Sequence, residues 1–164
     1  MKRIYLVRHA KSSWKDPRLT DINRPLNKRG KKDAPFMGDQ LNKNQIKPDL
    51  ILSSPANRAK NTALIISEKI CHPAKKIVFK DELYEASERK LLDFIKKLDE
   101  RIDSVMIFAH NPGLTQLNNL ISNHYIDNIP TCGVVALEID KKWSEVGKNS
   151  CNFLFFDYPK KFLK

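Results

Sequence analysis

Short apolar runs alternate along the chain with stretches whose apolar residues recur every three or four positions. The two most apolar runs are Ile4–Val7 and Val105–Ala109, and no polar residue interrupts either of them. Strands have this pattern when both of their faces are buried, as in a parallel sheet covered by helices on two sides. Together with weaker runs they predict six strands: Arg3–Val7, Leu50–Ser53, Lys76–Phe79, Val105–Ala109, Val134–Ile139 and Asn152–Phe156.

Apolar side chains at helical spacing predict four helices between these strands. The helical stripes are Ala34, Met37 and Leu41; then Ala59, Ala63, Ile66 and Ile70; then Leu91, Ile95, Leu98 and Ile102; and finally Pro112 through Leu117 to Ile121. Pro35 predicts a kink in the first helix or a delayed start, and residues 160–164 predict a frayed tail. We therefore expect one α/β domain over residues 1–164, a three-layer sandwich with a mostly parallel sheet of about six strands flanked by helices.

The composition narrows the class of protein. No apolar run approaches the ~20 residues that a membrane helix needs, and Ile4–Val7 ends too soon for a secretory leader, so we expect a cytoplasmic protein. Cys71, Cys132 and Cys151 are too few and too scattered for a disulfide framework. Cys71-His72 has no partner ligands in the sequence and does not predict a metal site.

The net charge of +11, from 30 Lys+Arg against 19 Asp+Glu, indicates either a solvated basic surface or an anionic partner. That partner could be an anionic substrate, an acidic protein or a nucleic acid. Because aromatic residues do not interleave with the basic ones as in RNA-binding modules, we expect no nucleic-acid partner. Charge alone does not choose between the other two.

Two predicted strands end in a histidine. The first runs into Arg8-His9, and the strand ending at Ala109 runs into His110-Asn111-Pro112-Gly113. Ligands of parallel α/β sheets bind outside the carboxyl ends of the strands. We therefore expect His9 and His110 to face one crevice, although a hundred residues separate them.

Arginines supply the remaining candidate groups. Ser54 fits an N-cap and Pro55 the first helical position, which places Arg58 about one turn into a helix whose N-terminus favours an anion. Arg24 precedes a turn and either adds a further guanidinium or lies at the surface.

This set of side chains suits phosphoryl transfer without a metal. A neutral imidazole can attack phosphorus, and arginines with a second histidine can neutralise the phosphoryl oxygens. The sequence contains no carboxylate cluster for Mg²⁺, no Walker loop and no cysteine phosphate loop. We therefore expect a phosphatase with His9 as nucleophile and with no metal or cofactor.

The ordered set of motifs resembles the histidine phosphatase superfamily, the group that includes cofactor-dependent phosphoglycerate mutases. The similarity spans residues 3 to about 140, and Ala10 stands where the family usually has Gly. The motifs are Leu6-Val7-Arg8-His9-Ala10, Arg24-Pro25-Leu26 with Gly30, Ser53-Ser54-Pro55 to Arg58-Ala59, Thr62-Ala63, and His110-Asn111-Pro112-Gly113.

The resemblance implies a phosphoglycerate mutase-like fold and roles for the matched residues. His9 would be the nucleophile, with Arg8, Arg58 and His110 as catalytic phosphoryl-binding groups. Arg24 matches a phosphate-contacting arginine of SixA-like phosphohistidine phosphatases, and Asn111 is a further substrate-binding candidate. Glu85 fits the family's general acid, with Glu82 and Glu88 as alternatives, and the pattern equally fits three solvated surface charges.

Only 24 residues separate Glu85 from His110, whereas relatives that act on small metabolites insert longer segments there. This compactness favours the SixA-like branch, with a phosphohistidine-bearing protein as substrate and a monomer as the expected state. Two alternatives stay open: a phosphomonoesterase acting on small molecules, and a non-catalytic module that binds phosphoprotein.

Overall fold

The sheet of this computed structural model, which describes residues 1–162, has the strand order β3-β2-β4-β1-β5-β6. β1 pairs in parallel with β4, β4 with β2 and β2 with β3, whereas β5 is antiparallel to both β1 and β6. The strands are β1 (Lys2–Arg8), β2 (Leu50–Ser53), β3 (Val78–Phe79), β4 (Ser104–Ala109), β5 (Val134–Ile139) and β6 (Asn152–Asp157). The predicted strand at Lys76–Phe79 is wrong in its first half, because residues Ala74–Lys76 form a 3-10 turn.

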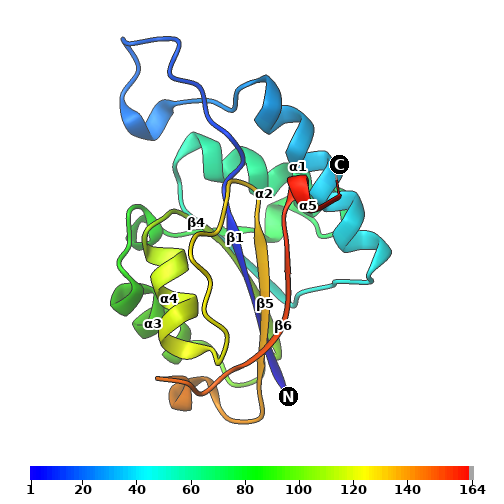
Figure 1. Ribbon diagram of the computed structural model, residues 1–164, viewed down its shortest axis with the longest axis vertical. Helices are drawn as coiled ribbons and strands as arrows, with labels where there is room; N and C mark the ends of the chain where they lie inside the picture. Colours follow the sequence, from blue (N-terminus) through cyan, green and yellow to red (C-terminus); the bar gives the residue numbers. More distant parts are fainter. Residues whose placement is uncertain (163–164) are drawn as a thin grey trace.

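Helices cover both faces of the sheet (Figure 1). α1 (Lys28–Lys43), α2 (Asn57–Lys69) and α5 (Pro159–Phe162) lie on one face, and α3 (Glu88–Lys96) and α4 (Gly113–Ile121) lie on the other. Alternate residues of β1 enter two apolar cores: Tyr5 and Val7 pack with the first group of helices, Ile4 and Leu6 with the second. The three-layer α/β sandwich with a mostly parallel sheet is therefore confirmed.

Helix boundaries depart from the sequence pattern in two places. Pro35 lies inside α1 without delaying its start, since Asn27 caps the helix and the core contacts of Ala34 and Met37 outweigh one lost hydrogen bond. The third predicted stripe is wrong at its end. α3 stops at Lys96, and the turns that follow present residues 98 and 102 to the same core.

The predicted tail 160–164 is helical as far as Phe162, and residues 163–164 lie outside the described residues. Within the described chain, no helix has both the length and the apolar character that crossing a membrane requires.

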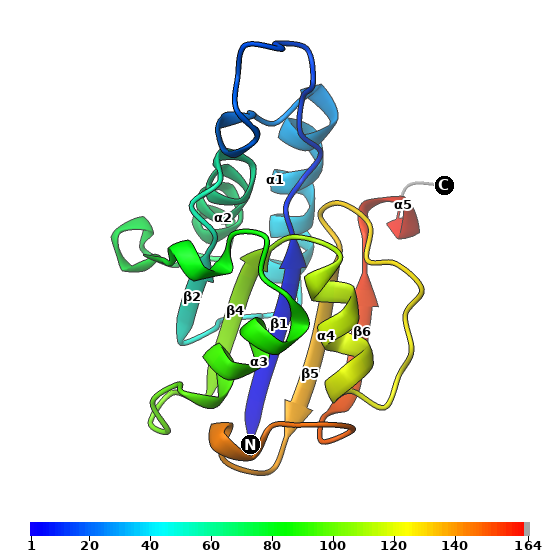
Figure 2. The same ribbon diagram turned by 90° about the vertical axis from the view of Figure 1, so that its left-hand side faces the viewer.

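β1 and β4 bring the two histidines to the same edge of the sheet. Their register pairs Arg8 with Ala109, so His9 and His110 are the residues that follow the strands at equivalent positions. Figure 2 shows β1, β2 and β4 pointing toward the end of the molecule where the segment between β1 and α1 forms a projecting loop.

Candidate active site

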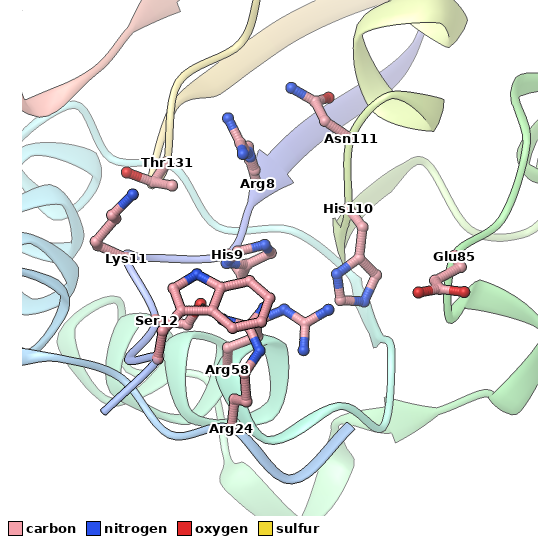
Figure 3. A pocket seen from close by; sticks show the side chains of 11 residues that line it. Arg8, His9, Lys11, Ser12, Arg24, Arg58, Glu85, His110, Asn111 and Thr131 are labelled. Carbon is pink, nitrogen blue, oxygen red and sulfur yellow. The ribbon is translucent and has the colours of Figure 1, made fainter. Parts of the chain in front are cut away.

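A cavity of about 240 Å³ opens at the carboxyl ends of β1, β2 and β4 (Figure 3). Its lining contains each of the seven side chains that the sequence singles out, together with four that it does not. The lining residues are Arg8, His9, Lys11, Ser12, Trp14, Arg24, Arg58, Glu85, His110, Asn111 and Thr131. The volume suits one phosphoryl group and the side chain that carries it.

His9 follows β1 and remains held against β4. Its backbone N–H donates to the carbonyl of Ala109 at 3.3 Å, and its ring centroid lies 5.2 Å from that of His110. The side chain is 8% exposed, and Nδ1 lies 2.8 Å from the carbonyl oxygen of Ala10. A carbonyl can only accept a hydrogen bond, so Nδ1 carries the proton and Nε2 carries the lone pair.

The surroundings of His9 keep its imidazole neutral. Burial is the main cause that lowers its pKa to about 3, and the charges of Arg58 and Arg8, joined by that of His110 when its ring is protonated, act in the same direction. The hydrogen bond to Ala10 opposes this shift without cancelling it. A neutral ring with a free Nε2 lone pair can act as a nucleophile at neutral pH.

His110 is bound through Nε2, whereas His9 is bound through Nδ1. Nε2 lies 2.8 Å from the hydroxyl oxygen of Ser54, which is fully buried, and the ring of Tyr84 meets the imidazole edge-on at 5.6 Å. The Ser54 hydroxyl accepts the Ala56 N–H, and within the described chain its own proton has no acceptor other than Nε2. Ser54 is therefore the donor, and Nδ1 of His110 carries the ring proton.

Burial, followed by the charge of Arg58, lowers the pKa of His110 to about 4. The ring is therefore neutral at pH 7, yet its Nδ1–H remains a hydrogen-bond donor. The two histidines are thus neutral for the same reason but expose different nitrogens.

The start of α2 corrects the prediction for Ser54 and Pro55. α2 begins at Asn57 with Ala56 as N-cap, because the Ser54 hydroxyl bonds to the Ala56 N–H and to His110 and not to the first turn. Arg58 is consequently the second residue of the helix, and it is almost fully buried.

Asp21, which the sequence reasoning missed, holds both interior arginines. Its backbone carbonyl accepts from Nη1 of Arg58 at 2.8 Å, and its carboxylate accepts from Nη2 of Arg58 at 3.0 Å and from Nε of Arg24 at 3.1 Å. The hydroxyl of Tyr84 donates to the same carboxylate at 2.5 Å. These contacts, led by that of Tyr84, lower the pKa of Asp21 to about 2, and the same bond raises the pKa of Tyr84 to about 12.

Three buried donors in residues that line the cavity beside His9 have no acceptor in the described part of the chain. Within the described residues, Nε of Arg8, Nε of Arg58 and Nδ1 of His110 have no hydrogen-bond partner. Leaving one such group unpaired costs about 1–3 kcal/mol. All three residues line the cavity, and an oxyanion next to His9 is an acceptor of the kind that such donors suit.

The three candidate acids occupy different places. Glu85 lines the cavity and has a left-handed backbone with φ of 52°, which is unusual for a residue other than glycine. Glu82 lines a separate hollow beside α3, and Glu88 is the first residue of α3.

Asn111 lies at the cavity wall with its amide already bonded to protein. The nitrogen donates to the carbonyl of Ile129, and the oxygen accepts from the backbone and hydroxyl of Thr115. Its predicted contact with substrate stays a prediction. In the part of the chain that the structure describes, His, Cys, Asp and Glu side chains form no group of three or more that could hold a metal ion.

Known proteins resemble this chain in sequence and in fold. The sequence profile of the histidine phosphatase superfamily (branch 1) matches residues 4–91. The fold superposes with a TM-score of 0.82 on a protein of Agrobacterium tumefaciens assigned as phosphohistidine phosphatase SixA, which is 30% identical, with 96% of this chain and 98% of that chain covered.

Two further solved structures share the fold. A tungstate complex of the protein histidine phosphatase SixA gives a TM-score of 0.83 at 20% identity, over 99% of each chain. A mycobacterial glucosyl-3-phosphoglycerate phosphatase gives 0.66 at 12% identity, over 96% of this chain and 98% of that one. The set of neighbours therefore includes enzymes for protein and for small-molecule substrates.

Proposed function

The chain belongs to the histidine phosphatase superfamily, and from this premise we propose that it removes phosphate from phosphohistidine in a protein, through a phosphorylated His9. The observation that carries the proposal is the set of three buried, unpaired donors beside a neutral imidazole whose free nitrogen is Nε2. Those donors match the charge that a transferring phosphoryl group spreads over its oxygens.

The reaction has two steps. In the first, Nε2 of His9 attacks phosphorus, a new P–N bond forms, and the P–N bond to the substrate imidazole breaks. The departing nitrogen takes up a proton from solvent or from Glu85. In the second, water attacks phosphorus, the P–N bond to His9 breaks, and inorganic phosphate leaves with His9 neutral again.

Arg8, Arg58 and His110 hold the phosphoryl oxygens in both steps, and Arg24 shapes the rim of the cavity. Asp21 fixes the two guanidiniums of Arg24 and Arg58, so their positions are set before the substrate arrives. The three cysteines are free thiols in the described chain, which supports our placing this reaction in the cytoplasm.

The substrate assignment rests on the leaving group. An imidazole leaves with little assistance, whereas the alkoxide of a phosphomonoester needs a proton in the transition state. Glu85 is exposed at the edge of the cavity, and among residues 1–162 no hydrogen bond or ion pair holds its carboxyl. A site of this kind suits a phosphohistidine substrate.

A phosphomonoesterase is the second candidate, because Glu85 does line the cavity and the fold also occurs in a small-molecule phosphatase. Glu85→Gln separates the two. We expect the variant to hydrolyse phosphohistidine within about twofold of the unaltered protein. Hydrolysis of p-nitrophenyl phosphate should also fall little, because that ester has a good leaving group. Hydrolysis of glycerol phosphate, whose alkoxide needs a proton, should fall by about 10²-fold or more.

The direct test mixes the protein with a phosphohistidine phosphotransfer domain and with glycerol phosphate, in the presence of EDTA. We expect faster release of phosphate from the protein substrate, and intact mass should show a phosphoryl adduct that His9→Ala lacks. Loss of activity in EDTA would contradict the metal-free reaction. Faster turnover of glycerol phosphate would favour the second candidate. Binding without turnover would instead point to a phosphoprotein-binding module.

A further inference from the structure

A projecting loop borders the cavity on the side of Trp14. Residues 13–20, which we call the rim segment, extend beyond the carboxyl ends of the strands between β1 and α1 (Figure 2). The segment is anchored at its base, where the Ser13 N–H donates to the carbonyl of Pro25 at 2.8 Å and Ser12 pairs with Leu26. Farther out, the Leu19 N–H donates to the carbonyl of Asp16.

Trp14 is exposed to an unusual degree for its type. Its side chain is 73% exposed, yet the guanidinium carbon of Arg24 lies 3.4 Å from the indole centroid. Arg24 is itself buried and held by Asp21 and Ser12. One face of the indole is therefore fixed against the cavity wall, and the rest of the ring is open to solvent.

The rim segment exposes two large apolar side chains, and the charged residues in and around it are mostly basic. Leu19 is the second large apolar side chain that the segment exposes. Residues 11–32 contain eight Lys or Arg against two Asp, and so carry more than half of the net charge of +11. Lys11, Lys15 and Lys28 are all exposed.

The cavity is too small to hold more of a protein substrate than its phosphorylated side chain. A volume of about 240 Å³ admits a phosphorylated side chain, so the remainder of a protein substrate stays outside, at the rim. A preordered tryptophan among basic residues has the composition of an interface centre, and basic residues guide acidic partners to it.

We propose that the rim segment is the docking surface for the substrate protein, and that it receives an acidic face of that protein next to its phosphohistidine. This inference rests on the proposed function and names the partner surface for the same site. Trp14 and Leu19 would make the apolar contacts, and Lys11 and Lys15 would pair with carboxylates.

The test compares one leaving group in two settings: a phosphohistidine phosphotransfer domain with an acidic surface, and the free amino acid phosphohistidine. Lys15→Glu and Leu19→Ala should each lower kcat/KM on the protein about tenfold and leave the amino acid unchanged. Lys141→Glu is the matched control, because Lys141 is exposed beyond β5, at the opposite end of the sheet. Equal rates for all three variants on the protein, or equal losses on both substrates, would overturn the docking proposal.

Fluorescence gives a reading that does not depend on turnover. Trp143 is fully buried, so the solvent-exposed part of the emission comes from Trp14. In His9→Ala protein, the phosphotransfer domain should shift this emission to the blue, and added salt should weaken the shift. Unchanged emission under saturating binding would contradict docking at the rim. Undiminished hydrolysis by His9→Ala would instead remove the proposed function and leave the fluorescence to decide the docking surface.

Discussion

His9 and His110 occupy equivalent places at the ends of two adjacent parallel strands, yet their rings are bound in opposite ways. Both are buried, and burial is the main cause of the low pKa of each. His9 is bonded through Nδ1 to a backbone carbonyl, whereas His110 is bonded through Nε2 to the hydroxyl of Ser54. The first contact leaves a lone pair free, and the second leaves an N–H free.

The difference shows that strand position alone does not assign a chemical role to a histidine. An acceptor that cannot donate fixes His9 as the residue with a nucleophilic nitrogen. A hydroxyl with one proton to give makes His110 a neutral donor toward the cavity. Under the proposed function, the same residue type would supply the two complementary roles that phosphoryl transfer needs, nucleophile and hydrogen-bond donor.

Replacement of His9 should have the largest effect. His9→Ala removes the lone pair that we propose attacks phosphorus, and we expect at least a 10⁴-fold loss of kcat. Arg8, Arg58 and His110 still present their unpaired donors, so tungstate should bind to the variant, as isothermal titration calorimetry can measure. Residual turnover within tenfold of the unaltered protein would show that another residue is the nucleophile.

Replacement of His110 should cost less. His110→Ala removes one donor to the phosphoryl oxygens but leaves the nucleophile in place, and the loss of one such donor lowers kcat about 10²–10³-fold. Rapid-quench experiments should still detect phosphorylated His9, formed more slowly. If the two variants were equally inactive and neither formed the adduct, the contrast between the histidines would be lost.

The sequence predicts the neighbourhood of these histidines well. Hydrophobic runs locate β1 and β4, and the carboxyl ends of parallel strands meet at one edge, so Arg8, His9 and His110 could be placed together without a structure. Similar reasoning predicts Arg58 near an anion site, although its helix starts later than the sequence indicates.

Contacts between side chains distant in the chain could not be predicted in this way. Asp21 meets Arg58 across 37 positions and Tyr84 across 63, and Ser54 meets His110 across 56. No local periodicity encodes such pairs, because they depend on how loops pack over the finished sheet. The only signal for Asp21 was its position three residues before Arg24. The same limit applies to Leu98 and Ile102, whose helical spacing continues after α3 has ended.

Replacement of Ser54, which bonds to His110, should have a smaller effect than replacement of either histidine. Ser54→Ala removes the donor to Nε2 of His110, so the ring proton can move to that nitrogen and the Nδ1 donor is partly lost. We expect about a tenfold fall in kcat and, in ¹⁵N spectra, a shift of the His110 tautomer that His9 does not share. Ser53→Ala is the matched control, because Ser53 is equally buried and its hydroxyl bonds only to the carbonyl of Ser54 in the described chain. An unchanged His110 tautomer in Ser54→Ala would refute the assigned direction of this hydrogen bond.

Lowering the pH should have the smallest effect near neutrality, because neither histidine ring changes charge there. In the unfolded chain both titrate near the ordinary imidazole pKa of about 6.5, whereas in the folded protein the values are about 3 for His9 and about 4 for His110. Between these limits the unfolded chain binds more protons. The contribution to stability is therefore complete above pH 6.5 and is lost as the pH falls toward 4 and then 3, by at most about 1.4 kcal/mol per pH unit for each ring.

Urea unfolding at pH 7.5 and 5.0 should show this loss, and His9→Asn should reduce it. Ring-proton shifts of both histidines should stay constant from pH 8 to 5. A midpoint near 6.5 for His9 would mean that its nucleophilic lone pair is protonated close to neutrality, and the role assigned to its Ala10 contact and burial would fail.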